Sequence, residues 1–293
     1  MRTLLRKASA YLLYPFYLAT VLTIITLAIR HHWDYSKTYG LTTLGLVLSF
    51  IILEYLIPLE RKWRMTWKSF LRDLKYIAVD APLIAIVKSG FGLLAIYYSS
   101  HHQGLFSKTP LVPAVIGFLL VFDFFQYWYH RWSHTGKGSL GKFLWEVHLA
   151  HHLPDRVYVV MHAVFNPINA VITATLLQTP LVLLGISPEA VLAATLLIDL
   201  QTIIGHFNVE IRAGFLNYIF IGTETHRYHH SANPEEAKNF GSVLAIWDIL
   251  FGTFLYKPGK VPRHLGVDGQ GAYPASNNLW KVVTYPFVRK IPV

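Results

Sequence analysis

The amino-acid sequence predicts an all-α integral membrane protein with about four transmembrane helices and an additional helical hairpin. Of its 293 residues, 53% are hydrophobic and only 14% are charged, and the mean hydropathy is +0.38. A soluble domain of this length needs many more charged side chains to cover its surface. Several apolar runs also approach or reach the roughly 20 residues that a helix needs to cross a bilayer. The chain is therefore expected to be a multi-pass protein of a bacterial cytoplasmic membrane or of the ER membrane.

Four apolar runs in the first half of the chain predict the membrane-spanning helices. They cover approximately residues 10–29, 41–59, 77–99 and 111–129. The third run contains Asp80, Pro82, Lys88 and two glycines, so a broken or re-entrant element is expected there. No cleavage site of a signal peptide is evident after the first run, so this run is expected to remain as an anchor.

Residues 168–205 form two apolar halves that predict the helical hairpin. The halves are separated by LLGISPEA, in which Gly185 can end one helix and Ser187 can cap the next. Pro188 suits the first position of that next helix. From about residue 256 the chain is basic and rich in Gly and Pro, which predicts a surface arm.

The distribution of charge predicts how the helices are oriented. The net charge is +10, and six Lys or Arg residues against one Asp fall in the segment 61–75, beside an apolar run. With Trp63 and Trp67 among them, this segment is expected either to touch anionic headgroups or to act as a plain positive-inside flank. Such clustering at membrane flanks argues against a nucleic-acid partner. If this segment and the basic N-terminus face the cytoplasm, residues 130–165 and 206–293 face it as well.

Because the chain contains no cysteine, histidine or carboxylate must carry any metal chemistry. Nine of the 15 histidines fall into four clusters, all on the predicted cytoplasmic side. The clusters are HRWSH with His130 and His134, HLAHH with His148, His151 and His152, GHFNVE with His206, and HRYHH with His226, His229 and His230. Isolated histidines are expected to be interfacial or loop residues because they lack a clustered partner. These are His31, His32, His101, His102 and His264.

The spacing within the clusters suits metal binding. On a helix, residues three and four apart share a face, so H-x3-H presents two imidazoles to one point and H-x2-H-H adds a third. A single metal ion needs only three or four protein ligands. Nine clustered histidines exceed this number and indicate two metal ions held between several helices. Imidazole suits Zn, Cu, Fe and Ni alike, so the spacing alone does not select the metal.

The order H-x3-H, H-x2-H-H, H-x2-H-H after paired membrane spans resembles the fatty acid hydroxylase/sterol desaturase superfamily of membrane di-iron oxygenases. DFFQYWYHRWSH at residues 123–134 looks like the D-x3-Y-W-x-H-R-x2-H motif of that superfamily. HRYHHSANPEEAKNFGSVLAIWDILFGTF at residues 226–254 is similar to its closing block, including Asn239-Phe240-Gly241, Trp247-Asp248 and Phe251-Gly252-Thr253. The resemblance covers approximately residues 120–256.

The resemblance implies a function for the clustered histidines. It implies that two iron ions, which zinc can replace in the purified protein, are bound by His130, His134, His148, His151, His152, His206, His226, His229 and His230. It further implies that O2 is split there and that one oxygen atom enters a C–H bond of a membrane lipid, fatty acyl or sterol-like substrate. Desaturation by the same centre is the nearest alternative. No fused haem, flavin or iron–sulfur module is evident, so electrons are expected from an external donor such as a cytochrome or ferredoxin system.

Two alternatives from other classes remain open on the sequence alone. A membrane metal-binding or transport protein without redox chemistry predicts polar ligands inside the spans, whereas the clusters lie at span ends. A zinc-dependent hydrolase predicts three protein ligands and an open position, which is fewer ligands than the chain offers. The predicted domains are an anchoring part over residues 1–110, a catalytic part over residues 111–256 and a basic tail over residues 257–293.

Carboxylates near the clusters are expected to support the metal site. Glu146, Asp155 and Glu224 are candidates to accept the second ring N–H of a ligating histidine. Asp123 and Asp199 lie inside apolar runs, each seven residues before a clustered histidine. An ionisable side chain is costly there and usually functional, and pairing within the bundle is the alternative.

One position departs from the pattern of the superfamily. After the second cluster, relatives often carry a His-Pro pair, whereas this chain reads MHAVFNPIN with Asn166-Pro167 in the expected place. His162, four residues upstream, is expected to be either a ligand or a structural residue, and Asn166 to approach the metals through water. Glu210, four residues after His206, is a further candidate ligand, with a solvated loop carboxylate as the favoured alternative. No catalytic residue is identified beyond the metal ligands.

Overall fold

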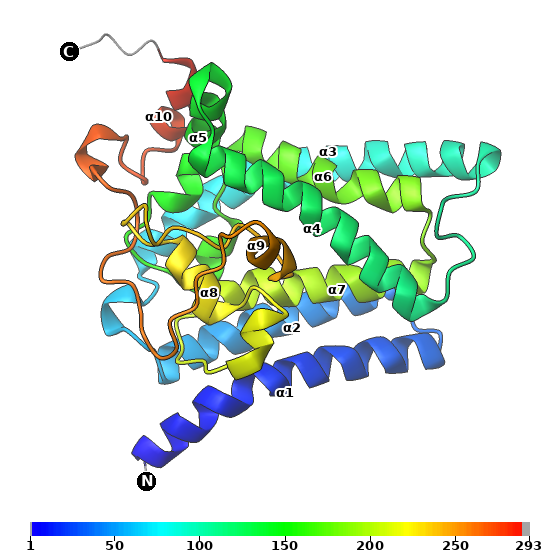
Figure 1. The fold of residues 1–293 in the computed structure, drawn as a ribbon, viewed down its shortest axis with the longest axis horizontal. Helices are drawn as coiled ribbons and strands as arrows, with labels where there is room; N and C mark the ends of the chain where they lie inside the picture. The colour runs from blue at the N-terminus through cyan, green and yellow to red at the C-terminus, as the bar shows by residue number, and fades with distance from the viewer. Residues whose placement is uncertain (1, 289–293) are drawn as a thin grey trace.

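The computed structural model describes residues 2–288, and every regular element in this range is a helix (Figure 1). The long helices are α1 Arg2–Arg30, α2 Tyr35–Leu56, α3 Trp67–His101, α4 Leu111–Thr135, α6 Pro167–Leu184 and α7 Pro188–Gly205. The shorter elements are α5 Gly138–His152, α8 Thr223–His229, α9 Ile246–Leu250 and α10 Leu279–Thr284, with the 3-10 turns η1 Arg61–Trp63, η2 Val159–Ala163, η3 Gly214–Tyr218, η4 Gln270–Ala272 and η5 Tyr285–Phe287. The predicted all-α class is confirmed.

The six long helices are each long and apolar enough to cross a membrane. They correspond to the four predicted spans followed by the two halves of the predicted hairpin. α7 is the most deeply buried, since 61% of its most apolar window is inside the molecule, against 6% for α3. It packs against α1, α2 and α4, and its Leu196 and Leu200 share the main core with Phe50 and Phe118. α7 therefore forms the centre of the bundle.

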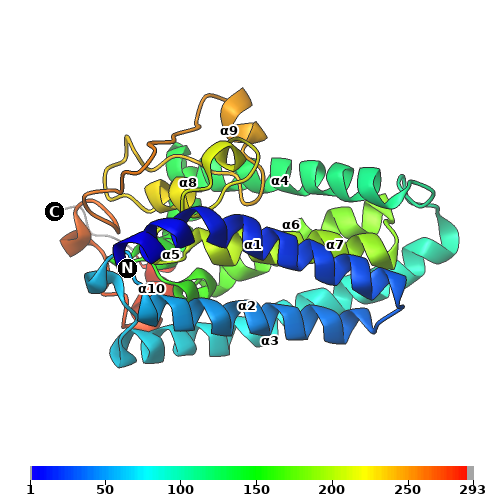
Figure 2. The same ribbon diagram turned by 90° about the horizontal axis from the view of Figure 1, so that it is seen from below.

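The connections between the long helices gather at two opposite ends of the bundle (Figures 1 and 2). One end, named here the short-loop end, carries the links around residues 31–34, 102–110 and 185–187. The other end, named here the histidine end, carries α5, α8, α10 and both ends of the described chain. The segments that the charge distribution places on the cytoplasmic side therefore lie at the same end of the bundle.

The hairpin of α6 and α7 forms as the sequence predicts. Ser187 caps α7 by accepting from the Ala190 amide, and Pro188 takes the first position. Gly185 ends α6 with φ +58°, a left-handed conformation that favours glycine. A Cβ on Gly104 would lie 2.5 Å from the Gly185 Cα, so the two links at the short-loop end pack backbone to backbone.

The third apolar run is not broken, so the expectation of a broken or re-entrant element is wrong. α3 is one continuous helix of 35 residues with Pro82 inside it. Proline removes one backbone hydrogen bond, but α3 packs along α6, and this packing supports the helix. α3 begins at Trp67, inside the basic segment 61–75. Arg72 in this segment is buried against Asp73 instead of facing headgroups.

The C-terminal tail lies largely on the surface, as predicted, but it is packed against the rest of the molecule. It folds back over the histidine end, where Leu265, Val267 and Val282 are buried. The Gly266 amide donates to the His230 carbonyl at 3.1 Å. Its basic, Gly- and Pro-rich composition suggests an exposed arm, but a few apolar side chains fix it against α5. The proposed domain boundaries at residues 110 and 256 stay predictions.

The charge distribution predicts that the loop before α3 and residues 130–165 and 206–288 share one side, and all of them lie at the histidine end (Figure 1). That this end faces the cytoplasm stays a prediction. Single cysteines introduced into this cysteine-free chain at Lys68, Lys137 and Lys238 are expected to react with a membrane-impermeant maleimide from the cytoplasmic side. Labelling at position 137 from the side opposite to position 238 would contradict a shared histidine end.

Candidate metal centre

Four helices end at one place and carry the clustered histidines in or just after their last two turns. α4 supplies His130 and His134, α5 supplies His148, His151 and His152, α7 is followed by His206, and α8 supplies His226 and His229 with His230 at its end. The C-terminal end of a helix carries a partial negative charge, because its last carbonyls are not used in intrahelical bonds. Four such ends at one place favour a bound cation.

The nine predicted histidines form two groups of donor atoms. The first donor group contains His130, His134, His148, His152 and His229, and the second donor group contains His151, His206, His226 and His230. Within each group the candidate ligand atoms all lie within 4.8 Å of one another. The two groups adjoin, because the rings of His152 and His230 stack with centroids 4.6 Å apart. The isolated His31, His32, His101, His102 and His264 are exposed and belong to neither group.

Each H-x2-H-H motif is divided between the two groups. On α5, His148 and His152 belong to the first group and His151 to the second. HRYHH has the reverse arrangement, with its first and last histidines in the second group and His229 in the first. Successive residues on a helix point about 100° apart, so adjacent histidines face different points. The expectation that each motif directs three imidazoles at one metal is therefore wrong.

Carbonyl oxygens fix the orientation of most of these rings. The Nδ1–H groups of His130, His151, His206 and His229 donate to the backbone carbonyls of Phe240, Val164, Thr202 and Lys238 at 2.8–3.2 Å. His148 donates in the same way to the side-chain oxygen of Asn169 at 3.1 Å. A carbonyl oxygen only accepts, so Nδ1 carries the proton in each of these rings. A neutral imidazole protonated at Nδ1 presents a bare lone pair at Nε2.

These Nε2 atoms face one another at short distances. In the first group, His148 Nε2 lies 3.0 Å from the Nε2 atoms of His130 and His152. In the second group, His206 Nε2 lies 3.1–3.2 Å from those of His151, His226 and His230. Facing lone pairs repel unless a cation lies between them. Nitrogen atoms bound to one metal at about 2.0–2.1 Å are separated by roughly 2.9–3.4 Å, so both groups fit a metal ion.

Protons are poor candidates for that cation. Burial lowers the pKa of His206 to about 3, and it lowers the pKa of His148, His152 and His229 well below the usual range, with neighbouring histidines adding to the effect. In addition, Nε2 of His134 is buried and has no hydrogen-bond partner among the described residues, although it belongs to the first donor group. Neutral imidazole nitrogens, one of which is buried without a hydrogen-bond partner, suit a transition-metal ion.

The lowered pKa values predict how the metal-free protein responds to acid. A histidine in the unfolded chain has a pKa of about 6.5, whereas these buried histidines stay neutral in the folded protein. Below pH 6.5 the unfolded state binds protons that the folded state does not bind. Each such histidine therefore lowers the free energy of unfolding by up to about 1.4 kcal/mol per pH unit as the pH falls from 6.5 towards its folded pKa. The thermal unfolding midpoint of chelator-treated protein is expected to fall between about pH 7 and about pH 5. A midpoint that stays constant over this range would show that the rings do not stay neutral.

Glu224 and Asp155 do not fix histidine rings, contrary to the sequence-based expectation. Glu224 accepts from the Ala213 amide and from the Asn217 side chain, at 2.8 Å each. Asp155 is exposed and pairs with Arg156 at 2.9 Å. Backbone carbonyls, and not these carboxylates, accept the Nδ1–H groups of four of the clustered histidines. Glu146 is buried on α5, and its expected role stays a prediction.

Two buried carboxylates hold the backbone that orients the first donor group. Asp123 accepts from the amides of residues 242–244 at 2.8–3.2 Å. Asp248 accepts from the amides of residues 240 and 241 at 2.8 Å each. The carbonyl of Phe240, within the segment held by both, accepts the Nδ1–H of His130 at 2.8 Å. Asp123 is thus a positioning residue that acts on the site through this segment.

Glu54 and Asn169 are supporting residues that the sequence analysis missed. Glu54, buried on α2, accepts from the amides of Val159 and Asn208 at 2.9 and 2.8 Å. It ties α2 to the segments that follow α5 and α7. Its sequence signal is the same as that of Asp123, a carboxylate inside an apolar run. Asn169 has no such signal, because an amide is unremarkable in a helix until its partner, His148, is known.

Asn166 is a helix cap, so its expected approach to the metals is wrong. Its side-chain oxygen accepts from the Ile168 amide at 3.0 Å, and its side-chain nitrogen donates to the Val283 carbonyl at 3.3 Å. His162 lies beside the second donor group, with its ring centroid 6.2 Å from that of His206, but it belongs to neither group. Glu210 pairs with Arg212 at 2.8 Å, as expected for a loop carboxylate.

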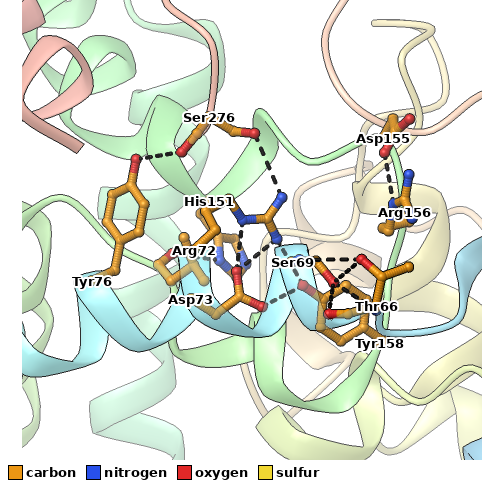
Figure 3. Close-up of polar contacts among 11 residues, drawn as sticks. Thr66, Ser69, Arg72, Asp73, Tyr76, His151, Asp155, Arg156, Tyr158 and Ser276 are labelled. Atoms are coloured by element: carbon orange, nitrogen blue, oxygen red, sulfur yellow. Dashed lines mark hydrogen bonds and ion pairs between the residues drawn. The ribbon is translucent and has the colours of Figure 1, made fainter. Parts of the chain in front are cut away.

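A buried ion pair supports the loop that follows α5 (Figure 3). Arg72 pairs with Asp73 at 2.6 Å and donates to the Tyr158 hydroxyl at 2.7 Å, and this hydroxyl donates to Asp73. Tyr76, one turn later on α3, donates to the Ser276 carbonyl in the tail at 3.0 Å. The cluster therefore joins α3, the loop after α5 and the C-terminal tail.

Comparison with known proteins identifies the class to which this site belongs. Residues 115–253 match the family model described as fatty acid hydroxylase. This match falls on the part of the chain that carries the histidine motifs, and it confirms the resemblance of that part to the fatty acid hydroxylase/sterol desaturase superfamily.

Three relatives show how far the similarity extends. An ornithine lipid hydroxylase, OlsE, from Rhizobium tropici is 29% identical over 98% of this chain and 86% of that protein. Human alkylglycerol monooxygenase is 33% identical over 47% of this chain, but this match covers only 30% of that protein. Methylsterol monooxygenase 1-3 from Arabidopsis thaliana is 26% identical over 75% of this chain and 82% of that protein. No solved structure matches the chain significantly.

Proposed function

We propose that the protein is a membrane-bound di-iron hydroxylase that uses O2 to insert one oxygen atom into a C–H bond of a membrane lipid. The observation that carries this proposal is the convergence of bare Nε2 atoms in two adjacent groups. The first donor group would hold one iron ion and the second donor group the other. Iron bound there would supply the activation of O2, and two electrons and two protons from outside the chain would convert the second oxygen atom to water.

The residues of the chain prepare this chemistry by holding the ligands ready. Carbonyls of Phe240, Val164, Thr202 and Lys238 keep the Nδ1 protons of four rings in place, so these rings do not have to reorient when a metal binds. Burial keeps the imidazoles neutral and limits the access of bulk water. The donor groups lie where the spans end, so a lipid can reach them while its tail stays in the bilayer.

The relatives support a lipid substrate and hydroxylation. Their names describe an ornithine lipid hydroxylase, an alkylglycerol monooxygenase and a methylsterol monooxygenase, so hydroxylation is favoured over desaturation. A metal transporter would need ligands along the spans, whereas both donor groups lie at the histidine end. An external electron donor and a cytoplasm-facing site complete the proposal.

Metal analysis combined with isotope labelling tests the proposal. Protein prepared anaerobically with Fe(II) is expected to bind about two metal ions per chain, because the donor groups offer five and four histidines and one ion needs only three or four protein ligands. With reductant, membrane lipid and 18O2, one 18O atom is expected in a hydroxylated lipid, and this product should be absent when 16O2 is used with 18O-water. Label found only in water, together with an unsaturated product, would instead establish desaturation. Binding of fewer than two ions would contradict the di-metal assignment.

A further inference from the structure

A cavity inside the membrane-spanning part of the protein leads from the short-loop end towards the second donor group. It has a volume of about 480 Å³ and is bordered by α2, α3, α6 and α7. α2 packs on α7, and α3 packs on α6. Figures 1 and 2 show α2 and α3 in one layer beneath the α6–α7 hairpin and diverging towards the short-loop end. This cavity is named here the intramembrane groove. The α6–α7 hairpin forms one wall of it, and α2 and α3 form the two sides.

The lining of the groove is mainly aliphatic with one polar end. Leu177 on α6 and Leu192 on α7 are among its aliphatic residues, and Asp199 and Lys88 lie at the polar end. The Asp199 carboxylate accepts from the Thr43 hydroxyl at 2.7 Å and interacts electrostatically with Lys88. Because α2 and α3 already supply partners for this carboxylate, the free surface of the groove is the aliphatic part.

The polar end of the groove is the end nearest to the second donor group. Asp199 precedes His206 by seven residues on the same helix, which corresponds to about 10 Å. His162 stands beside this path, since its ring lies 6.2 Å from that of His206 and it interacts electrostatically with Asp199. At the other extreme, Pro188 lines the groove and precedes His206 by 18 residues, or about 27 Å. The groove thus follows α7 from the short-loop end to within two helical turns of the second donor group.

We infer that the intramembrane groove binds the aliphatic chain of the lipid substrate and determines which chain lengths are accepted. This inference rests on the proposed function. In this arrangement the free end of the aliphatic chain lies at the short-loop end of the protein. The headgroup of the lipid stays at the membrane interface of the histidine end, where polar groups are solvated. Hydroxylation therefore falls in the part of the chain near the headgroup, because only that part reaches the donor groups.

A matched pair of substitutions on one helix tests the role of the groove. Leu177 lines the groove, whereas Leu183, six residues later on α6, is 51% exposed on the lipid-facing surface. Leu177→Trp fills the groove and is expected to lower the yield of the longest-chain hydroxylated lipids at least about tenfold relative to the shortest. Leu177→Ala, which enlarges the groove, is expected to shift the product profile towards longer chains. Leu183→Trp adds the same bulk outside the groove and should leave the profile unchanged.

A binding measurement separates this inference from the proposed function. A phospholipid with a photoreactive diazirine near the end of one acyl chain is expected to crosslink to the peptides around Leu177 and Leu192. Crosslinking should fall at least about tenfold in Leu177→Trp and not in Leu183→Trp. Unchanged crosslinking and an unchanged product profile in Leu177→Trp would overturn the groove assignment while leaving the hydroxylase intact. A wild-type protein that crosslinks there but yields no hydroxylated lipid would overturn the proposed function instead.

Discussion

Replacement of His229 by alanine is expected to lower the metal content from about two ions per chain towards one. It is also expected to lower hydroxylase activity by more than about a hundredfold, because even the loss of a residue that hydrogen-bonds a ligand often lowers metal affinity or activity about 10–100-fold. His229 is fully buried, and its Nε2 lies 3.1 Å from that of His152. Its Nδ1–H is held by the Lys238 carbonyl at 3.0 Å, so the lone pair is aimed before any metal binds. Metal content by elemental analysis and product formation by lipid mass spectrometry measure the two effects.

The division of HRYHH between the two donor groups provides an internal comparison. His230→Ala removes a donor from the second group. It is therefore expected to release the other metal ion and again to leave about one metal ion per chain. His264→Ala and His101→Ala, which change exposed rings, should keep the metal content and activity of the wild type. Metal content near two ions in both His229→Ala and His230→Ala would show that these rings are not ligands.

The spans and the position of the site could be predicted because their signals are local. A membrane helix must be apolar over its own length, so hydropathy alone locates all six spans. Paired helices with basic flanks then bring the four histidine clusters to one end. Asp80, Pro82 and Lys88 are also local signals, but they misled the prediction for α3 because the packing of α6 against it is not visible in the sequence.

The internal order of the site could not be predicted, because it depends on contacts between distant residues. His130 and Phe240 are 110 residues apart, and any residue can supply the backbone carbonyl that orients the ring. Acidic side chains near the clusters therefore appeared to be the natural partners, and for Asp155 and Glu224 this was wrong. The division of each H-x2-H-H motif follows from helix geometry, but only once the second group has been located in space.

Asp123 shows how a carboxylate that belongs to neither donor group can act on the site. It is completely buried on α4, and its two oxygens accept from three consecutive amides, those of residues 242–244. These amides belong to a segment that is distant from α4 in the sequence, since residues 123 and 242 are 119 positions apart. Tertiary contacts such as these hydrogen bonds therefore hold it against α4. Without the carboxylate, three buried donors lose their acceptor, and each such loss costs about 1–3 kcal/mol.

Asp123→Ala is therefore expected to lower the free energy of unfolding by about 3–5 kcal/mol and to weaken metal retention in the first donor group. The second effect follows because the released segment carries the Phe240 carbonyl that holds His130. Asp123→Asn keeps one oxygen acceptor, so its loss should be smaller, and Asp155→Ala, which removes an exposed carboxylate, should stay within about 0.5 kcal/mol of the wild type. Thermal unfolding in detergent, followed with and without a competing chelator, measures both effects. If Asp123→Ala unfolds and releases metal like the wild type, the segment 240–244 must be held by other contacts, and Asp123 has no positioning role.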